Sequence, residues 1–134
     1  MKDVMQTEKK TDIHIVVANG YDRVIMALSE LLELESDLRV VGQSTNGPDT
    51  LNILRDSDPD VLVLGLMNSE WDSLNLARQV GDSFPSMSIV FISVYNDGYY
   101  RDEAARAGVT EYVAMSEIGA RLVPAIRSAA KVSF

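Results

Sequence analysis

Few side chains in this sequence have the type and spacing that catalysis requires. There is no cysteine, and His14, the single histidine, stands within an apolar run. Ser69 and Ser93 have no neighbouring base to activate them, and the Gly-x-Ser-x-Gly pattern of a nucleophile turn is absent. These observations argue against thiol, imidazole and serine-hydrolase chemistry, so we expect no enzyme and no cofactor.

Acidic side chains are the remaining candidates for chemistry. Asp22, Glu70 and Asp72 each follow an apolar run, and three carboxylates brought together could hold a hard cation such as Mg²⁺. Each also has a simpler role, because Asp22 and Asp72 stand where helix N-caps are expected and Glu70 belongs to a polar loop. We favour the simpler roles and predict no metal site.

The elements that position these residues follow from the apolar pattern. Five short apolar runs predict strands over residues 13–18, 38–42, 61–64, 88–93 and 111–114. Helical spacing of apolar residues predicts helices that begin near Asp22, Thr50, Asp72, Tyr99 and Ser116. Pro124, inside the last of these, should kink that helix or mark its true beginning. The alternation predicts an α/β fold, a doubly wound parallel sheet between two layers of helices.

Length and composition fit one domain. The chain has 134 residues, of which 46% are hydrophobic, enough for a core without disulfide or metal support. We expect a flexible segment over residues 1–12, a domain over 13–131, and a tail or the start of a linker over 132–134. No apolar run reaches the roughly 18 residues of a spanning helix, and no signal peptide is evident, so we expect a cytoplasmic protein without membrane contact.

Charge points to a protein partner. A net charge of −8 argues against direct binding of nucleic acid. Five basic and only four acidic residues lie from Arg101 onward, so nearly all the negative charge precedes it. Arg101, Arg106 and Arg121 accompany Tyr99 and Tyr112 in this last quarter, a mixture typical of interfaces. We predict that a protein partner or a second copy of the chain binds there.

Several segments, taken in order, resemble a known family. HIVVANGYD, PDVLVLGLMNSEWD, IVFISVYND and ARAGVTEYVAM are similar to the strand ends of response-regulator receiver domains of the CheY-like superfamily, closest to receivers that precede a helix-turn-helix output domain. The resemblance covers about residues 13–131. It implies a flavodoxin-like (βα)5 fold with strand order 2-1-3-4-5 and a pocket at the first and third strands. It also implies two-component, phosphorelay signal transduction in transcription regulation, with a C-terminal DNA-binding domain as a potential missing partner.

The resemblance also identifies the positions that carry the family's chemistry. Receivers accept a phosphoryl group on an aspartate that ends the third strand, with Mg²⁺ held by that aspartate and an acidic pair ending the first strand. A lysine that ends the fifth strand pairs with the acceptor. In this sequence Gly65 stands at the acceptor position, Asn19 and Gly20 at the acidic pair, and Met115 at the lysine. The resemblance therefore implies a degenerate phosphorylation site.

Two switch positions of the family are retained. Ser93 keeps the hydroxyl position at the end of the fourth strand, and Tyr112 keeps the aromatic position on the fifth. Gly65 leaves room, which we expect Met67 or Met115 to fill rather than a ligand. Trp71 is open to two interpretations, a hydrophobic anchor over the pocket or an exposed contact for a partner.

Two functions remain open. The first is a pseudo-receiver that acts without phosphorylation, by protein contact or dimerisation through the helix over residues 99–107, the strand over 111–114 and the last helix. The alternative is a sensor of a small molecule or anion that uses the pocket near Asn19, Gly20, Gly65 and Ser93. A flavin role on the same fold is disfavoured, because the first loop lacks a phosphate cradle rich in serine and threonine. We favour the first function.

Overall fold

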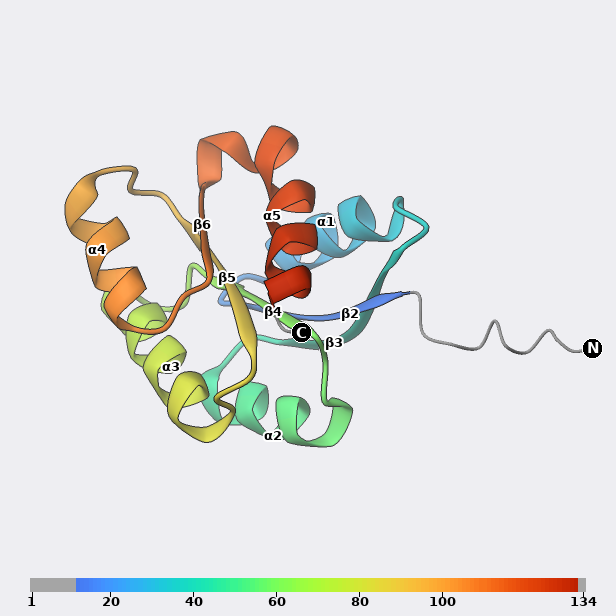
Figure 1. Cartoon of the computed structure of the whole chain (residues 1–134), viewed down its shortest axis with the longest axis horizontal. Coiled ribbons are helices and arrows are strands. Elements are labelled where there is room, and N and C mark those ends of the chain that lie inside the picture. The colour runs from blue at the N-terminus through green and yellow to red at the C-terminus, as the bar shows by residue number, and fades with distance from the viewer. Residues whose placement is uncertain (1–11, 133–134) are drawn as a thin grey trace, which may run out of the picture.

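The computed structural model describes residues 12–132, so most of the predicted flexible segment and the last two residues of the predicted tail lie outside it. Five strands form a single sheet: β2 (Ile13–Asn19), β3 (Leu38–Ser44), β4 (Val61–Gly65), β5 (Ser88–Ser93) and β6 (Glu111–Ala114). All pairs are parallel and the order is β3-β2-β4-β5-β6 (Figure 1). The predicted fold class and strand order are confirmed.

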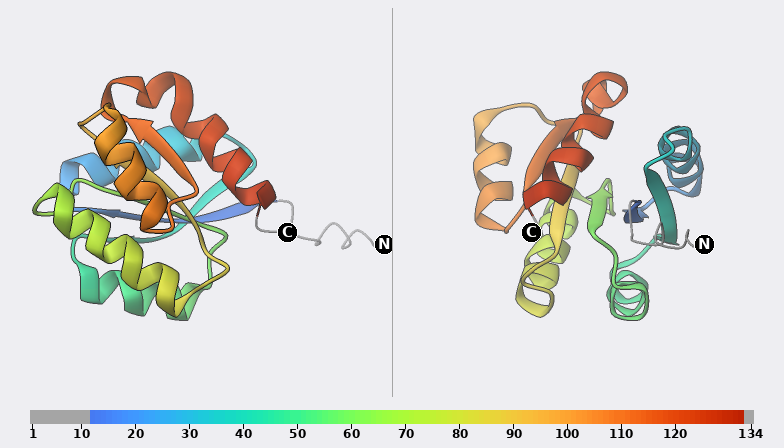
Figure 2. Two further views of the ribbon diagram at one scale, coloured as in Figure 1. Left: turned by 60° about the vertical axis from the view of Figure 1, so that its left-hand side comes forward. Right: turned by 45° about the vertical axis from the view of Figure 1, so that its right-hand side comes forward.

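Helices cover both faces of the sheet (Figure 2). They are α1 (Asp22–Glu33), α2 (Gly47–Ser57), α3 (Glu70–Ser83), α4 (Gly98–Arg106) and α5 (Ile118–Val132), and a 3-10 turn, Met115–Glu117, precedes the last. The apolar stripes of α1 and α5 pack on one face, and those of α2, α3 and α4 pack on the other. This three-layer arrangement leaves the carboxyl ends of the strands together at one edge.

The central strand explains why its sequence is apolar at every position. Val61 and Val63 point into the core beneath α1 and α5, whereas Leu62 and Leu64 point into the core on the α2 and α3 side. All four side chains are at most 1% exposed. A strand buried on both faces has no polar position, and the continuous run follows from that placement.

Two predicted N-caps are wrong. Ser69, not Asp72, caps α3, because the Ser69 hydroxyl accepts a hydrogen bond from the Asp72 amide at 3.0 Å. Tyr21 is the N-cap residue of α1, and Asp22 is the first residue inside that helix. The two aspartates lie instead in first turns, where their charge interacts favourably with the helix dipole.

The last helix also differs from its prediction. Ser116 lies in the 3-10 turn and α5 begins at Ile118, so Ser116 is not its cap and Pro124 is not its beginning. Pro124 lies inside α5, where it cannot donate a hydrogen bond to the preceding turn. Burial of Leu122 and Ile126, both fully inaccessible, holds this stretch of α5 against the sheet.

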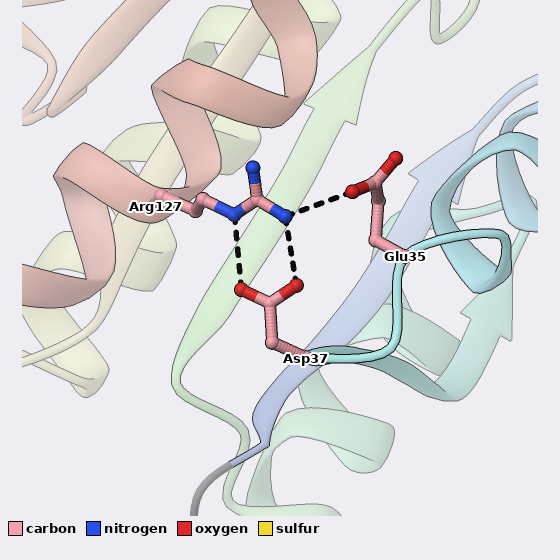
Figure 3. A network of polar contacts seen from close by, with 3 residues as sticks. All are labelled: Glu35, Asp37 and Arg127. Carbon is pink, nitrogen blue, oxygen red and sulfur yellow. Dashed lines mark hydrogen bonds and ion pairs between the residues drawn. The ribbon is translucent and has the colours of Figure 1, made fainter.

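One polar network ties α5 to the loop between α1 and β3. The Arg127 guanidinium donates two hydrogen bonds to Asp37, at 2.9 and 2.8 Å, and one to Glu35 at 2.9 Å (Figure 3). The hydrogen bonds from Arg127 lower the pKa of Asp37, and both acids raise the pKa of Arg127. Such a bidentate pair fixes geometry more strongly than a single contact does.

Candidate functional site

The residues singled out from the sequence gather at the carboxyl edge of the sheet. Asn19 pairs with Gly65 in the ladder, and Ser93 pairs with Ala114, which Met115 follows. The strand ends therefore bring Asn19, Gly65, Ser93 and Met115 to one place, as expected for parallel strands.

Gly65 lies against the backbone of the neighbouring strand. A Cβ atom built on Gly65 would stand 2.1 Å from the carbonyl oxygen of Ile92, and its three nearest atoms all belong to Ile92. A contact this short is impossible without movement of β4 or β5. Only glycine fits this backbone, and the space beside it is filled by the chain itself.

The loop that follows is bent toward the end of β2. Leu66 has φ = 56°, in the left-handed region that a leucine rarely adopts. Its carbonyl accepts a hydrogen bond from the Gly20 amide at 3.0 Å, and a Cβ on Gly20 would stand 2.6 Å from that same oxygen. Gly20 and Leu66 therefore join the two loops through their backbones, and a side chain at position 20 would push them apart.

Asn19 is buried at this junction. Its side chain is 1% exposed, and its Oδ1 accepts a hydrogen bond from the Tyr21 amide at 3.0 Å. Its Nδ2 has no hydrogen-bond partner within residues 12–132. A buried amide group of this kind is costly when unpaired, so Nδ2 is a donor that could donate a hydrogen bond to a water or a ligand oxygen.

Neither methionine fills the place expected for it. Met67 is 8% exposed and packs in the core on the α2 and α3 side, and Met115 packs against the core of α1 and α5. The atoms nearest to Gly65 are those of Ile92, so the prediction that Met67 or Met115 covers Gly65 is wrong. The reason is the close approach of β4 to β5, which leaves no gap for a side chain.

Ser93 holds an acid over the strand ends. Its hydroxyl donates a hydrogen bond to Glu70 Oε2 at 2.7 Å and accepts one from the Tyr95 amide at 3.0 Å. Burial raises the pKa of Glu70 above its ordinary value, and the hydrogen bond from Ser93 opposes that rise. The first turn of α3 is thus connected to the end of β5 through Glu70.

Tyr112 is oriented by three contacts. Its hydroxyl donates to the Tyr95 carbonyl at 2.8 Å, and its ring stacks on Phe91 with centroids 5.9 Å apart. The Arg101 guanidinium lies 4.6 Å from the centre of the same ring. Burial raises the pKa of the Tyr112 phenol above its ordinary value.

An aromatic cluster extends this surface. Tyr95 stacks on Tyr100 at 4.3 Å, and Trp71 makes edge or tilted contacts with Tyr99 and Tyr100, each at 6.3 Å. Trp71 and Tyr99 remain 44% and 56% exposed. Trp71 therefore belongs to an exposed aromatic cluster rather than to the core. Exposed aromatic side chains are typical of interface surfaces.

The predicted interface arginines are less free than the sequence implies. Arg106 pairs with Glu103 at 2.7 Å, and Arg121 pairs with Glu117 at 3.2 Å. Arg101 is held by Asn96 and by the Tyr112 ring. The charges of Arg106 and Arg121 are thus partly neutralised by acids of the chain, whereas the partners of Arg101 are uncharged.

A groove runs beside these residues along the β6 edge of the sheet. It has a volume of about 430 Å³ and lies between β6, which contributes Tyr112, and α5, which contributes Arg121 and Pro124. Tyr112 and Arg121, two of the predicted interface residues, therefore line a concave surface, and the Tyr112 hydroxyl reaches the Tyr95 carbonyl of the aromatic cluster.

Other sequence candidates lie apart from this edge. His14 is the second residue of β2, and its amide donates to the Asp60 carboxylate at 2.8 Å, so it belongs to the amino end of the sheet. Among residues 12–132, no three His, Asp or Glu side chains converge on a point that could hold a cation. Asp22, Glu70 and Asp72 are therefore separate. In the same span no helix is long and apolar enough to cross a bilayer.

Curated relatives resemble this chain along most of its length. The transcriptional regulatory protein DesR of Bacillus subtilis is 29% identical over 116 residues, 87% of this chain and 57% of DesR. The response regulator protein VraR of Staphylococcus saprophyticus is 24% identical over 115 residues, 86% of this chain and 55% of VraR. The chain thus spans little more than half the length of these relatives, which are named as regulators rather than as enzymes.

Solved structures support the fold. A LuxR-family response regulator from Aurantimonas superposes with a TM-score of 0.84 at 20% identity, covering 90% of this chain and 86% of that one. The receiver domain of the response regulator NarL from Mycobacterium tuberculosis gives 0.80 at 21% identity, covering 90% and 97%. Residues 15–127 match the response regulator receiver domain family, and this extent shows that the chain belongs to that family.

Proposed function

We propose that this receiver domain transmits a signal through protein contacts, without phosphorylation at position 65, the end of β4. The observation that carries the proposal is the 2.1 Å approach of a Gly65 Cβ to the Ile92 carbonyl, which leaves no room for an acceptor side chain. Phosphoryl transfer to a receiver requires a nucleophile and charge neutralisation at one point, and glycine offers no nucleophile.

The residues at this edge do not fit Mg²⁺. A hard cation takes several oxygen ligands, usually carboxylates. Asn19 Oδ1 already accepts from the Tyr21 amide, Gly20 has no side chain, and Glu70 is hydrogen-bonded to Ser93. Met115, at the position where the family resemblance places a lysine, packs with apolar residues of α1 and α5. An uncompensated lysine there would be costly, so a methionine is consistent with a site that has no carboxylate.

The surface around Tyr112 supports protein binding as the output. Exposed aromatic side chains, here Trp71, Tyr95 and Tyr99, are enriched at interfaces and provide most of the binding energy in many of them. The groove between β6 and α5 is lined by Tyr112, whose hydroxyl donates to the Tyr95 carbonyl. We propose that a partner, or a second copy, binds over α4, β6 and α5, in a cytoplasmic regulator whose longer relatives are named as transcriptional regulators.

A sensor remains the second candidate, and the unpaired Asn19 Nδ2 is the observation that favours it. A bound oxygen acceptor would satisfy this donor. The Gly20–Leu66 hydrogen bond, which holds the two loops together, counts against a ligand as large as phosphate.

Incubation with acetyl phosphate and Mg²⁺, followed by intact mass measurement, tests the proposal. We expect no change in mass, whereas the gain of one phosphoryl group would contradict it. Equilibrium dialysis in the same mixture separates the two candidates, because phosphate retained without covalent mass gain would favour the sensor. A typical receiver treated in parallel shows that the reagent is active.

A further inference from the structure

β3 is the edge strand on the side of the sheet opposite β6. Within residues 12–132 its hydrogen-bonded neighbour is β2, and its other side faces outward beside α1 (Figure 2). An edge strand presents N–H and C=O groups on which another strand can pair. Proteins exploit such edges to bind extended peptides, with main-chain hydrogen bonds providing affinity.

A groove follows this edge. Its volume is about 480 Å³, and it is lined by Ser29, Glu30 and Glu33 of α1 and by residues 40–43 of β3. A second hollow adjoins it, sharing the two glutamates and adding the apolar side chains of Leu31 and Leu34. Leu34 is 80% exposed. The groove thus combines an open strand edge, two carboxylates and apolar contacts.

The Glu33 carboxylate lies where the backbone carbonyl of a neighbouring strand would accept a hydrogen bond from β3. Its Oε2 accepts a hydrogen bond from the Val40 amide at 2.7 Å. The Val40 amide points away from β2 to reach this carboxylate, so it is an outward-facing donor of the edge. The carbonyl of a docked strand could replace Glu33 there, and the released carboxylate could then pair with a cation of that strand.

We propose that the β3 edge binds a short, extended segment of a partner protein that carries lysine or arginine at alternate positions. Its backbone pairs with β3 at Val40, and its basic side chains, all on one face of the strand, meet Glu30 and Glu33. This site is separate from the surface around Tyr112 and from the strand ends at Asn19 and Gly65.

The charge of the groove favours binding of a basic segment over binding of a second copy of this chain. Pairing two β3 edges would bring Glu30 and Glu33 of both chains into one groove, and like charges at close range are unfavourable. The chain as a whole also carries a net charge of −8, which attracts a basic segment and repels another copy.

A bulge limits the length of the docked strand. Ile15 pairs with Val40 but Val16 pairs with Gly42, so Val41 is an extra residue in the ladder. The bulge twists the edge after Val40 and interrupts continuous pairing. The segment therefore pairs over a few residues rather than along the whole of β3.

Titration of the ¹⁵N-labelled chain with a blocked hexapeptide of alternating lysine and valine tests the proposal. The largest amide shift is expected at Val40, with slower hydrogen exchange there, while shifts centred elsewhere or no binding by about 1 mM would overturn the proposal. The same peptide N-methylated at alternate backbone positions keeps its charge but cannot pair, and equal binding of this control would also overturn it.

Charge variants provide the second measurement. Glu33→Gln should weaken binding of the lysine peptide about fivefold in low salt, since one of the two groove carboxylates is replaced by a neutral amide. Glu117→Gln removes the same charge at the opposite edge of the sheet, beside Arg121, and should leave the affinity unchanged. Equal weakening by both variants would mean that net charge, and not the β3 edge, attracts the peptide.

Discussion

Replacing Gly65 with alanine tests the steric reasoning most directly. The new Cβ would stand 2.1 Å from the Ile92 oxygen, against about 3.4 Å for an ordinary contact, so β4 and β5 must separate locally by roughly 1.3 Å. Overpacking costs about 1–3 kcal/mol and a weakened ladder hydrogen bond about 1 kcal/mol, and removal of glycine returns about 0.5–1 kcal/mol. We expect the free energy of unfolding to fall by about 2 kcal/mol.

Urea denaturation followed by circular dichroism measures this change, with an unchanged m-value as evidence that the unfolded state is unaffected. Gly81→Ala is the matched control. A Cβ on Gly81, in α3, would lie 3.7 Å from the Ala107 carbonyl, an ordinary contact. This variant should gain about 0.5–1 kcal/mol from helix propensity. A Gly65→Ala protein as stable as the parent chain would refute the argument that only glycine fits at the end of β4.

Two further predictions concern surface contacts. If association uses the Tyr112 surface, Arg101→Glu should weaken it in sedimentation experiments, and Arg55→Glu on α2 should not; equal effects of the two variants would count against that surface. Arg127→Met should reduce stability at neutral pH, because Asp37 and Glu35 lose their partner. The pKa of Asp37 is lowered below 3.8 in the folded chain, so its contribution is present above that value and is lost as the pH falls through the folded pKa. Urea denaturation curves of parent and variant should therefore converge in acid, and a constant difference would exclude the ion pair as the cause.

The fold was predictable because burial dictates composition. Strands covered on both faces must be apolar throughout, and helices with one buried stripe must show helical spacing, so both periods are visible in the sequence. Helix starts were less predictable. Ser69 and Asp72 are both competent N-caps three residues apart, and only the geometry shows that the Ser69 hydroxyl accepts from the Asp72 amide.

The site was predictable in position but not in detail. The strand ends bring Asn19, Gly65 and Ser93 to one edge, as the parallel topology requires. The pairing of Glu70 with Ser93 joins residues 23 positions apart, and no local pattern indicates it. Arg127 is one of the five basic residues from Arg101 onward, yet in the structure it is bound by the two acids of the α1–β3 loop.

The residue types at the strand ends depend on one another through backbone contacts as well as through charge. Charge alone relates Met115 to Gly65, since a lysine without a nearby carboxylate would be destabilising. The structure adds a steric relation: side chains at Gly20 and Gly65 would each meet a carbonyl oxygen, of Leu66 and of Ile92. The left-handed conformation of Leu66, with φ = 56°, directs its carbonyl toward the Gly20 amide and so belongs to the same arrangement. New carboxylates at positions 20 and 65 would therefore require the two loops to separate at Gly20 and β4 and β5 to separate at Gly65, which a change of side chains alone does not provide.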